Sequence, residues 1–226
     1  MRAVITGTSD GIGRSCAERF LLEGIEVFGF DIQESSIRHP LYHHCVFDIS
    51  SKEPVSVDDC EILINSAGTL TEEKAIETNL TGTIRFTERF RNAPSLKSIL
   101  FIASASARNG SEFPLYVASK AGIVGYMKNL ALNLGGRKIT VNSISPGGVI
   151  TSSNANIIED PVLYAAVKAE TLLGKWAEPE EVAELAYYLT VLNRSVTGED
   201  ILMDNGEMLR SNFIEAAGQE TPASTQ

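Results

Sequence analysis

The chain has 226 residues, of which 43% are hydrophobic and 21% charged, which is the composition of a folded globular protein rather than of a fibre or a disordered tail. Acidic residues outnumber basic ones by 29 to 19, and a net charge of −10 argues against nucleic-acid and anionic-lipid partners. The longest apolar runs fall far short of the roughly 20 residues that a membrane-spanning helix requires.

Strands and helices are expected to alternate along the chain. The expected strands lie at 3–6, 25–30, 42–47, 62–64, 98–103, 139–144 and 201–203. The expected helices run from the glycines after residue 6 to about residue 23, and over 70–91, 114–134, 160–173 and 179–192. Strands that alternate with helices need crossover connections, so we expect a doubly wound α/β fold with a parallel sheet covered on both faces.

One domain is expected over residues 1–214, followed by a flexible tail over 215–226 that lacks large apolar residues. The three cysteines, Cys16, Cys45 and Cys60, are odd in number, lack a CxxC spacing and follow no leader-like segment. These features predict a protein of the reducing cytoplasm.

Three glycines follow the first expected strand in the segment TGTSDGIG, residues 6–13. A side chain at Gly7, Gly11 or Gly13 would keep backbone amides from a pyrophosphate at the helix N-terminus. The spacing GxxxGxG is by itself a weak signal, and a plain tight turn is the alternative. Its place between strand and helix favours a dinucleotide site.

Asp31 ends the second expected strand, where a carboxylate can bind the hydroxyls of an adenosine ribose. The alternative is a carboxylate that only caps the strand end. The same charge would repel a 2′-phosphate, and neither its neighbours Ile32 and Gln33 nor Asp10 is basic. We therefore expect NAD to be favoured over NADP.

Tyr116 and Lys120 stand four residues apart on an expected helix, so their side chains project from one face and can touch. Tyr164 and Lys168 share this spacing. The strand before Tyr116 ends at Ser104, which places the first pair at the carboxyl edge of the sheet, where doubly wound folds bind ligands. The second pair is expected to serve packing.

An ammonium beside a phenol favours the phenolate, so we expect Lys120 to lower the pKa of Tyr116 from about 10 toward the working pH. The phenol could then donate or accept a proton while a hydride moves. Ser104 would hydrogen-bond the reacting oxygen, unless its hydroxyl only caps a backbone group.

These residues and their order resemble the classical short-chain dehydrogenase/reductase (SDR) family from Thr6 to about Gly206. The matching segments are TGTSDGIG (6–13), Asp48 in FDIS, NSAG (65–68), Asn79 in ETNLTGT, Ser104, YVASK (116–120) and SPGGVIT (145–151). The resemblance implies a Rossmann-like sheet in the order 3-2-1-4-5-6-7. It also implies an NAD(P)-dependent oxidoreductase acting on a secondary alcohol or ketone.

The resemblance implies four catalytic residues. Tyr116 would be the general acid/base, Ser104 would orient the reacting oxygen, and Lys120 would lower the pKa of Tyr116 and bind the ribose. Asn79 would order a relay water. The implied cofactor-binding residues are Gly7, Ser9, Asp10, Gly11, Ile12, Gly13, Asp31, Ile32, Asp48, Ile49, Asn65, Ala67, Gly68, Tyr116, Lys120, Pro146, Gly147, Val149 and Thr151.

Three spacings depart from the family pattern, and one of them is the interval of only 11 residues from Gly68 to Asn79, where the family has a longer approach. Ser104 precedes Tyr116 by 12 residues rather than about 13, so the loop between them should be one residue short, and Ser106 is a possible stand-in. Only 17 residues separate Asp48 from Asn65, too few for the usual helix. We expect the helix between strands three and four to be missing or reduced and residues 49–60 to cross in an extended form.

Three other functional expectations stay open. The chain could be a catalytically silent dinucleotide-binding sensor or scaffold, or a 3-oxoacyl-carrier-protein reductase, although Asn133 stands where the family's carrier-docking arginine is expected. No metal site is expected, because His39, His43 and His44 lack a third ligand of fixed spacing. The expected assembly is a homodimer or homotetramer through the helices at 70–91 and 116–134, acting on a small molecule.

Overall fold

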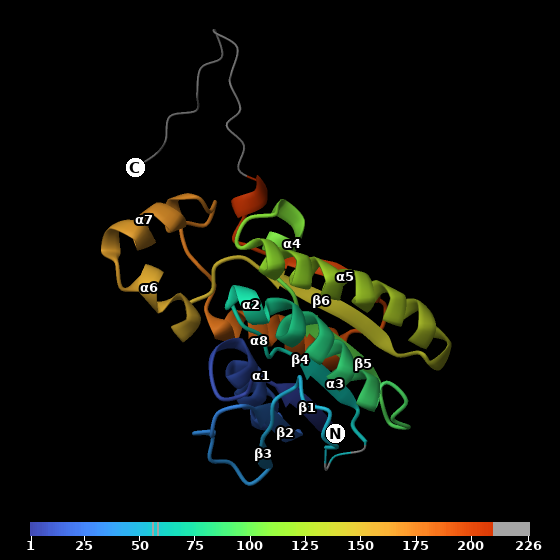
Figure 1. The fold of residues 1–226 in the computed structure, drawn as a ribbon. Helices are drawn as coiled ribbons and strands as arrows, with labels where there is room; N and C mark the ends of the chain where they lie inside the picture. Colours follow the sequence, from blue (N-terminus) through green and yellow to red (C-terminus); the bar gives the residue numbers. More distant parts are fainter. Residues whose placement is uncertain (56, 58, 210–226) are drawn as a thin grey trace.

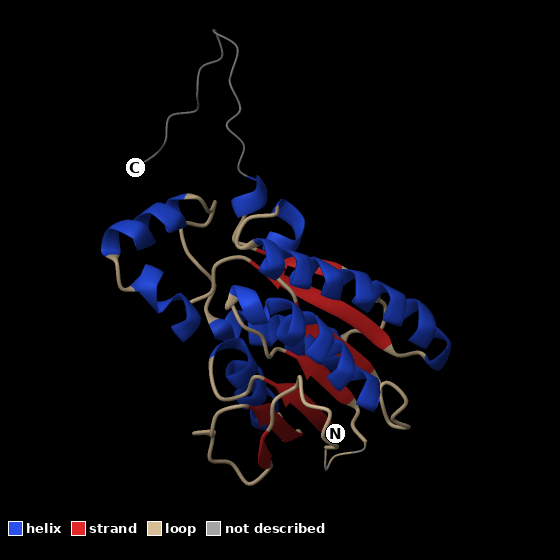
Figure 2. Cartoon of the chain, viewed as in Figure 1, coloured by secondary structure: helices blue, strands red, loops and turns tan. Residues whose placement is uncertain are grey.

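Seven parallel strands form one sheet in the order β3-β2-β1-β4-β5-β6-β7 in the computed structural model, which describes residues 1–55, 57 and 59–209 (Figures 1 and 2). This order confirms the predicted doubly wound topology. The strands are β1 (Arg2–Thr6), β2 (Glu26–Asp31), β3 (Tyr42–Val46), β4 (Ile62–Asn65), β5 (Ser98–Ile102), β6 (Thr140–Pro146) and β7 (Asp200–Met203).

The helices alternate with the strands as predicted. They are α1 (Gly11–Leu22), α2 (Glu72–Ala75), α3 (Thr83–Phe90), α4 (Ser106–Asn109), α5 (Pro114–Leu134), α6 (Ala155–Ile158), α7 (Pro161–Ala169) and α8 (Pro179–Tyr187). The helix expected over 70–91 is interrupted by a π-helical stretch, Ile76–Gly82, between α2 and α3. A second π-helical stretch, Tyr188–Leu192, continues α8. Such insertions widen the helix locally and are common at functional sites.

Successive residues of the central strands face opposite sides of the sheet. Ala3 and Ile5 pack into the layer formed by α1 and α8, whereas Val4 packs into the layer formed by α3 and α5. The same alternation holds in β5, where Leu100 joins the first layer and Phe101 the second. Because both faces are covered, the central strands are continuous apolar runs rather than alternating ones.

No helix lies between β3 and β4 in the described residues of that connection, which are 47–55, 57 and 59–61. Ile49 and Val57 of this connection are buried against the α3 and α5 layer. Two arginines of α3 hold its backbone: Arg85 donates to the carbonyl of Ser50, and Arg89 donates to the carbonyls of Ser51, at 2.9 Å, and Glu53, at 2.8 Å. Side-chain donors thus replace the hydrogen bonds that a helix would make internally.

Arg89 also lies over two aromatic rings, with its guanidinium carbon 5.6 Å from the ring centre of Phe47 and 5.9 Å from that of Phe86. The predicted tail, residues 215–226, and the last residues of the predicted domain lie outside the described part. Among the described helices, none combines the length and apolar character needed to cross a bilayer.

We expect Arg89→Ala to lower the free energy of unfolding by about 2 kcal/mol, because it removes charge-assisted hydrogen bonds and a cation–π contact from the helix-free connection. Urea unfolding followed by circular dichroism measures the change. Arg91→Ala is the control, since Arg91 makes a surface ion pair with Glu88 that is worth less than about 1 kcal/mol. Equal losses in the two variants would contradict the role given to Arg89.

Candidate active site

The predicted site residues gather at the carboxyl edge of the sheet. Because all seven strands are parallel, the loops after β1, β2, β4, β5 and β6 begin at this same edge. The helix α5 adds Tyr116 and Lys120 from its first turns. The segment with α6 and α7 projects beside this edge in Figure 1.

The turn after β1 requires glycine at two positions. Gly7 has φ +76°, its N–H donates to the carbonyl of Phe30 at 2.7 Å, and an added Cβ would lie 2.9 Å from the Cα of Ala67. A Cβ on Gly13 would lie 2.1 Å from the carbonyl oxygen of Gly7. The helix α1 therefore starts directly against the turn, with its N-terminus open to an anion.

The glycine turn contacts the loop after β6. Asp10 caps α1 by accepting a hydrogen bond from the N–H of Gly11 at 2.7 Å, and its other carboxylate oxygen accepts from the hydroxyl of Ser152. The methyl group of Thr151 lies 3.2 Å from the position that a Cβ on Gly11 would take. Two loops predicted to bind one dinucleotide are thus adjacent.

Asp31 is held by two main-chain donors. Its Oδ2 accepts from the N–H of Ser9 at 3.0 Å, and its Oδ1 accepts from the N–H of Gln33 at 2.9 Å. Each carboxylate oxygen keeps a further lone pair for a ligand hydroxyl. The side chain of Ile32 points into solvent, with 68% of its surface exposed.

The segment after β4 combines a tight anchor with an unsatisfied amide. The hydroxyl oxygen of Thr6 accepts from the N–H groups of Ser66 and Ala67, each at 3.0 Å. Asn65 is buried, yet neither its Oδ1 nor its Nδ2 has a hydrogen-bond partner. A buried amide without partners costs free energy. Its place at this edge therefore fits a site that receives a polar ligand.

The predicted adenine-contacting pair after β3 divides into one exposed and one buried residue. Asp48 is exposed, and its Oδ1 accepts from the N–H of Ser50 at 2.8 Å and from its hydroxyl at 2.6 Å. Ile49 is buried in the core. Its side chain is therefore committed to packing, which leaves only its main chain for a ligand.

Of the two candidate serines, Ser104 adjoins Tyr116 and Ser106 lies behind it. Ser106 is buried, and both its hydroxyl, at 2.7 Å, and its N–H, at 3.2 Å, donate to the Oγ of Ser104. Both lone pairs of Ser104 are thereby occupied. The hydroxyl hydrogen of Ser104 is left to be donated to another group.

The expected lowering of the pKa of Tyr116 is not found. Burial raises the pKa of Tyr116 above its ordinary value, the Ser104 hydroxyl opposes this rise, and the negative charge of Glu112 adds to it. Glu112 has φ +87°, an uncommon backbone conformation, in the loop that the sequence showed to be one residue short. The shortened loop thus brings a carboxylate toward the phenol.

Lys120 lies beside Tyr116, as the spacing predicted, but its ammonium is directed to the main chain. Its Nζ is 5.7 Å from the ring centre of Tyr116 and donates to the carbonyl of Ile102 at 2.9 Å. Only 7% of Lys120 is exposed, and burial lowers its pKa to about 8. Desolvation, which is a tertiary effect, therefore outweighs the pairwise attraction assumed from the sequence.

Asn79 lies in the π-helical stretch and fixes the loop after β4. Its Oδ1 accepts from the N–H of Thr69 at 2.7 Å, and its Nδ2 donates to the carbonyl of Thr69 at 2.9 Å and to Ser119 Oγ at 3.2 Å. Ser119 in turn donates to the carbonyl of Tyr116 at 2.7 Å. Because both amide hydrogens of Asn79 are used, the ordering of a relay water by this residue stays a prediction.

The loop after β6 is fixed by an aromatic ring that the sequence did not mark as functional. The Trp176 ring packs on Gly148, where an added Cβ would come within 2.2 Å of it. Tyr164 meets Trp176 edge to face at 5.9 Å, and Lys168 Nζ lies 4.4 Å from the ring centre of Tyr164. The second Tyr–Lys pair therefore serves packing, as predicted.

Three of the remaining predicted cofactor residues are placed by the sheet and its neighbours. The N–H of Gly147 donates to the carbonyl of Met203 at 3.0 Å, Pro146 ends β6, and Val149 is buried. Ile12 packs against the α1 and α8 core layer, and an added Cβ on Gly68 would lie 3.6 Å from Lys120 Nζ.

Sequence reasoning missed several residues that support this site. Thr6 and Ser119 lie inside the matching segments TGTSDGIG and YVASK, but neither was among the predicted site residues. The histidines were weighed only as metal ligands, whereas His44 binds the Tyr42 hydroxyl at 2.9 Å and the Gln33 carbonyl at 2.8 Å. No group of three or more His, Cys, Asp or Glu suited to a metal occurs in the part of the chain that the structure describes.

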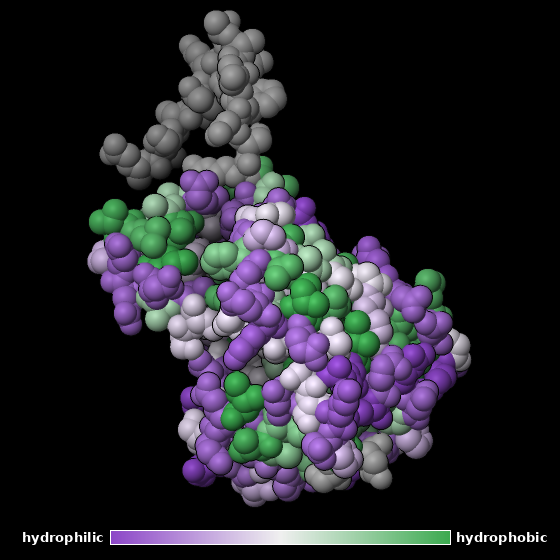
Figure 3. All heavy atoms as spheres, in the orientation of Figure 1, coloured by the Kyte–Doolittle hydropathy of each residue, from purple (hydrophilic) through white to green (hydrophobic). Residues whose placement is uncertain are grey.

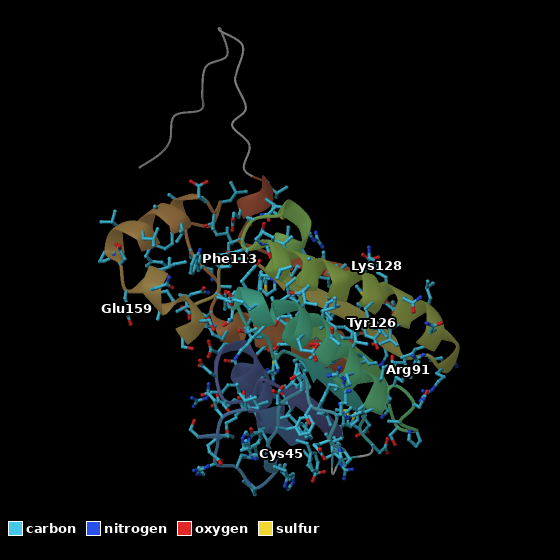
Figure 4. All side chains as sticks on the ribbon, in the orientation of Figure 1. Cys45, Arg91, Phe113, Tyr126, Lys128 and Glu159 are labelled. Atoms are coloured by element: carbon cyan, nitrogen blue, oxygen red, sulfur yellow. The ribbon has the colours of Figure 1, made fainter. Side chains whose placement is uncertain are left out.

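Apolar side chains surround the segment beside this edge. Figure 3 shows hydrophobic residues gathered over α6 and α7, where Val162 is 81% exposed. Phe113, at the start of α5, lies on the side of the molecule where α6 and α7 project (Figure 4). Glu207 lies near Gly147 of the loop after β6, where its Oε2 is 3.3 Å from the position that an added Cβ would take. The pKa of Glu207 is raised by burial and by the negative charges of Asp204, Glu170 and Glu112.

Comparison with known proteins identifies the family. Residues 59–207 match a family model described as enoyl-(acyl carrier protein) reductase. The chain is 30% identical to (+)-borneol dehydrogenase 1 of Salvia officinalis, over 90% of this chain and 92% of that protein. It is 28% identical to the 3-oxoacyl-(acyl-carrier-protein) reductase FabG of Aquifex aeolicus, over 90% and 96%.

A solved structure of 4-hydroxyisoleucine dehydrogenase complexed with NADH superposes with a TM-score of 0.81 at 26% identity, covering 93% of this chain and 99% of that one. The family model covers more than half of the chain, and the order of the strands and the motifs at their carboxyl ends agree with it. The chain belongs to the classical short-chain dehydrogenase/reductase family.

Proposed function

We propose that this protein transfers a hydride between NAD and a small secondary alcohol or ketone. The observation that carries the proposal is the meeting of Ser104, Tyr116 and Lys120 at the edge where the glycine turn opens. Membership of the family makes the protein an oxidoreductase with a nicotinamide cofactor. The choice of NAD and the nature of the substrate are the proposed part.

The preference for NAD rests on Asp31. Its carboxylate is fixed by two N–H groups and can accept hydrogen bonds from the two ribose hydroxyls. A 2′-phosphate in the same place would meet a fixed negative charge, and neither Ile32 nor Gln33 offers a cation. Similar proteins include a dehydrogenase complexed with NADH and a relative named L-rhamnose 1-dehydrogenase (NADP(+)), so the proposed choice rests on Asp31.

The residues present fit the cofactor along the whole edge. The glycine turn and the N-terminus of α1 would bind its pyrophosphate, Asp31 its adenosine ribose, Lys120 its nicotinamide ribose, and the loop after β6 its nicotinamide. The unpartnered amide of Asn65 would gain hydrogen bonds. The bound cofactor supplies the hydride acceptor or donor.

Proton transfer falls to Tyr116. In oxidation its phenolate accepts the hydroxyl proton of the alcohol, and in reduction its phenol returns a proton to the carbonyl oxygen. Ser104 donates its hydrogen toward the reacting oxygen, because Ser106 occupies both of its lone pairs. Ser104 and Tyr116 are half-buried and Lys120 is buried, which limits the access of water and strengthens these interactions.

The substrate we propose is uncharged or cationic, with an apolar portion. The apolar groups on α7 and Phe113 offer contact area, and the carboxylates of Glu112 and Glu170 lie close enough to Glu207 to raise its pKa. We take this group of carboxylates to border the substrate opening and to make it negative. Two relatives carry names of enzymes acting on small alcohols, borneol and 4-hydroxyisoleucine. An anionic substrate would be repelled at this opening.

A 3-oxoacyl-carrier-protein reductase is the second candidate, favoured by the likeness to FabG and by the family model's description. Two observations weigh against it. The negative opening proposed above is unsuited to an acidic carrier protein, and Asn133, which stands where a docking arginine is expected, donates to Asn129 at 2.8 Å. A catalytically silent sensor is the third candidate, and the retained Ser104, Tyr116 and Lys120 argue against it.

The proposal also includes the location and assembly of the protein, which we propose to be a cytoplasmic homodimer or homotetramer.

The decisive experiment compares the wild type with Tyr116→Phe on a panel of secondary alcohols, ketones and a 3-oxoacyl thioester, followed by the absorbance of reduced nicotinamide. We expect turnover to fall at least about a hundredfold, because the phenol is the proton donor and acceptor. Binding of NADH should change less than about twofold, since the ring is kept. A Tyr116→Phe variant that loses both turnover and NADH binding would contradict the role assigned to Tyr116. A wild type that shows no turnover on any compound of the panel would favour the sensor.

Glu112→Gln should shift the pH dependence of alcohol oxidation. The Glu112 carboxylate raises the pKa of Tyr116, so its removal lowers that pKa and moves the rising limb of kcat/KM to lower pH. Initial rates between pH 6 and 11 measure the shift. Glu112→Asp keeps the negative charge, so its pH profile should stay close to that of the wild type. A rising limb that moves to higher pH in Glu112→Gln would exclude the effect of Glu112 on the pKa of Tyr116.

The losses in kcat caused by Ser104→Ala and by Ser106→Ala should differ in size, and they should not be additive in the double variant. Ser104→Ala removes the donor to the reacting oxygen and is expected to lower kcat about 10- to 100-fold. Ser106→Ala acts only through Ser104 and should lower kcat about three- to tenfold. The double variant should be no slower than Ser104→Ala, as a thermodynamic cycle of kcat values would measure. Additive losses would mean that Ser106 acts on its own.

A further inference from the structure

A closed ring of hydrogen bonds lies beneath the loop that follows Asp31. The hydroxyl of Tyr42 contacts Thr8 Oγ1 at 2.9 Å and His44 Nδ1 at 2.9 Å. His44 Nε2 contacts the carbonyl oxygen of Gln33 at 2.8 Å. The hydroxyl of Ser9, the next residue after Thr8, donates to the same Gln33 carbonyl at 3.1 Å and closes the ring.

The backbone is shaped to admit this ring. A Cβ on Gly29 of β2 would lie 2.4 Å from the hydroxyl oxygen of Tyr42 and 2.5 Å from Thr8 Oγ1. Only glycine therefore leaves room for the two hydroxyls to meet across β2. Thr8 is fully buried, so its hydroxyl has Tyr42 rather than water as its partner.

The contact between His44 and Gln33 holds in either protonation state of the imidazole. A carbonyl oxygen only accepts, so Nε2 is the donor. When the imidazole is neutral, its Nδ1 accepts a hydrogen bond from the Tyr42 hydroxyl, and Thr8 donates to Tyr42. When the imidazole is protonated, its Nδ1 donates to Tyr42, and Tyr42 donates to Thr8. Either arrangement leaves every member of the ring with a partner.

The ring acts on Asp31 through a single residue, Gln33. Gln33 is bound at its carbonyl by His44 and Ser9, and its N–H donates to Asp31 Oδ1. The N–H of Ser9 donates to the other oxygen of the same carboxylate. The direction of the Asp31 carboxylate is thus determined by Ser9 after β1, Gln33 after β2 and His44 on β3 together.

We propose that Tyr42 and His44 are positioning residues that fix the Asp31–Gln33 segment for the adenosine ribose and thereby set the preference for NAD over NADP. The inference rests on the proposed cofactor site. A segment already fixed for the ribose hydroxyls loses little entropy when NAD binds. A 2′-phosphate meets the Asp31 charge whether the segment is fixed or loose, so it gains nothing from the ring.

The test measures the Kd of NADH and of NADPH by the fluorescence of the reduced nicotinamide for the wild type, His44→Ala, His44→Gln and Tyr42→Phe. We expect His44→Ala to raise the Kd of NADH about three- to tenfold and that of NADPH less than about twofold. Tyr42→Phe keeps the ring packing and should act in the same direction. His44→Gln places an amide donor near the Nε2 position and should restore most of the NADH affinity.

His43→Gln is the matched control on the same strand. Its imidazole faces the other side of the sheet, where it contacts Glu26 at 3.0 Å and stacks on Phe28 at 4.7 Å. It should leave both Kd values unchanged.

Equal weakening of NADH and NADPH, or wild-type affinities in both His44→Ala and Tyr42→Phe, would overturn the inference. A wild type that binds NADPH as tightly as NADH would overturn the proposed cofactor, and the inference with it.

Discussion

Parallel strand pairing is the constraint on which the site depends. Because every strand of the sheet runs in the same direction, each strand delivers its following loop to one edge, and residues far apart in the chain become neighbours there. Thr6 at the end of β1 accepts hydrogen bonds from the loop after β4, and Asp10 after β1 contacts Ser152 after β6. The α5 helix then lays Tyr116 and Lys120 along this edge. The grouping of the predicted site residues therefore follows from the topology of the sheet, and the individual motifs only supply the side chains.

Burial at this edge shifts the pKa of both Tyr116 and Lys120. It raises the pKa of Tyr116 and lowers that of Lys120 to about 8, so each shift is toward the neutral form, although an amine with a pKa of about 8 is still largely protonated at neutral pH. The Lys120 amine then binds the Ile102 carbonyl, and the Ser104 hydroxyl is the group that favours the phenolate. Because both the N–H and the hydroxyl of Ser106 donate to Ser104 Oγ, the Ser104 hydroxyl keeps its own hydrogen for donation. In this structure one hydrogen bond, from Ser104, therefore opposes the burial and the Glu112 charge that raise the pKa of Tyr116.

Much of this arrangement was predictable from the sequence, because it depends on local patterns. Alternating strands and helices predicted the sheet, and the i, i+4 spacing placed Tyr116 beside Lys120. The short interval before Asn65 predicted the missing helix. The direction of the Tyr116 pKa shift was wrong, because desolvation depends on the packing of distant segments. The carbonyl contacts of Arg85 and Arg89, and the ring through Tyr42 and His44, join residues with no shared sequence pattern.

The missing helix and the hydrogen-bond ring concern opposite faces of the edge strand β3. Tyr42 packs on the α1 side of the sheet, whereas Cys45 packs on the side of α3 and α5, where the connection without a helix runs. His43, between Tyr42 and His44, faces that thinner side and is exposed, stacked on Phe28. Both faces of β3 are partly exposed, since Val46, on the same face as Tyr42 and His44, is 52% exposed. The ring through Tyr42 and His44 lies on the face away from the connection without a helix, so its hydrogen bonds toward Gln33 and Asp31 do not depend on that connection.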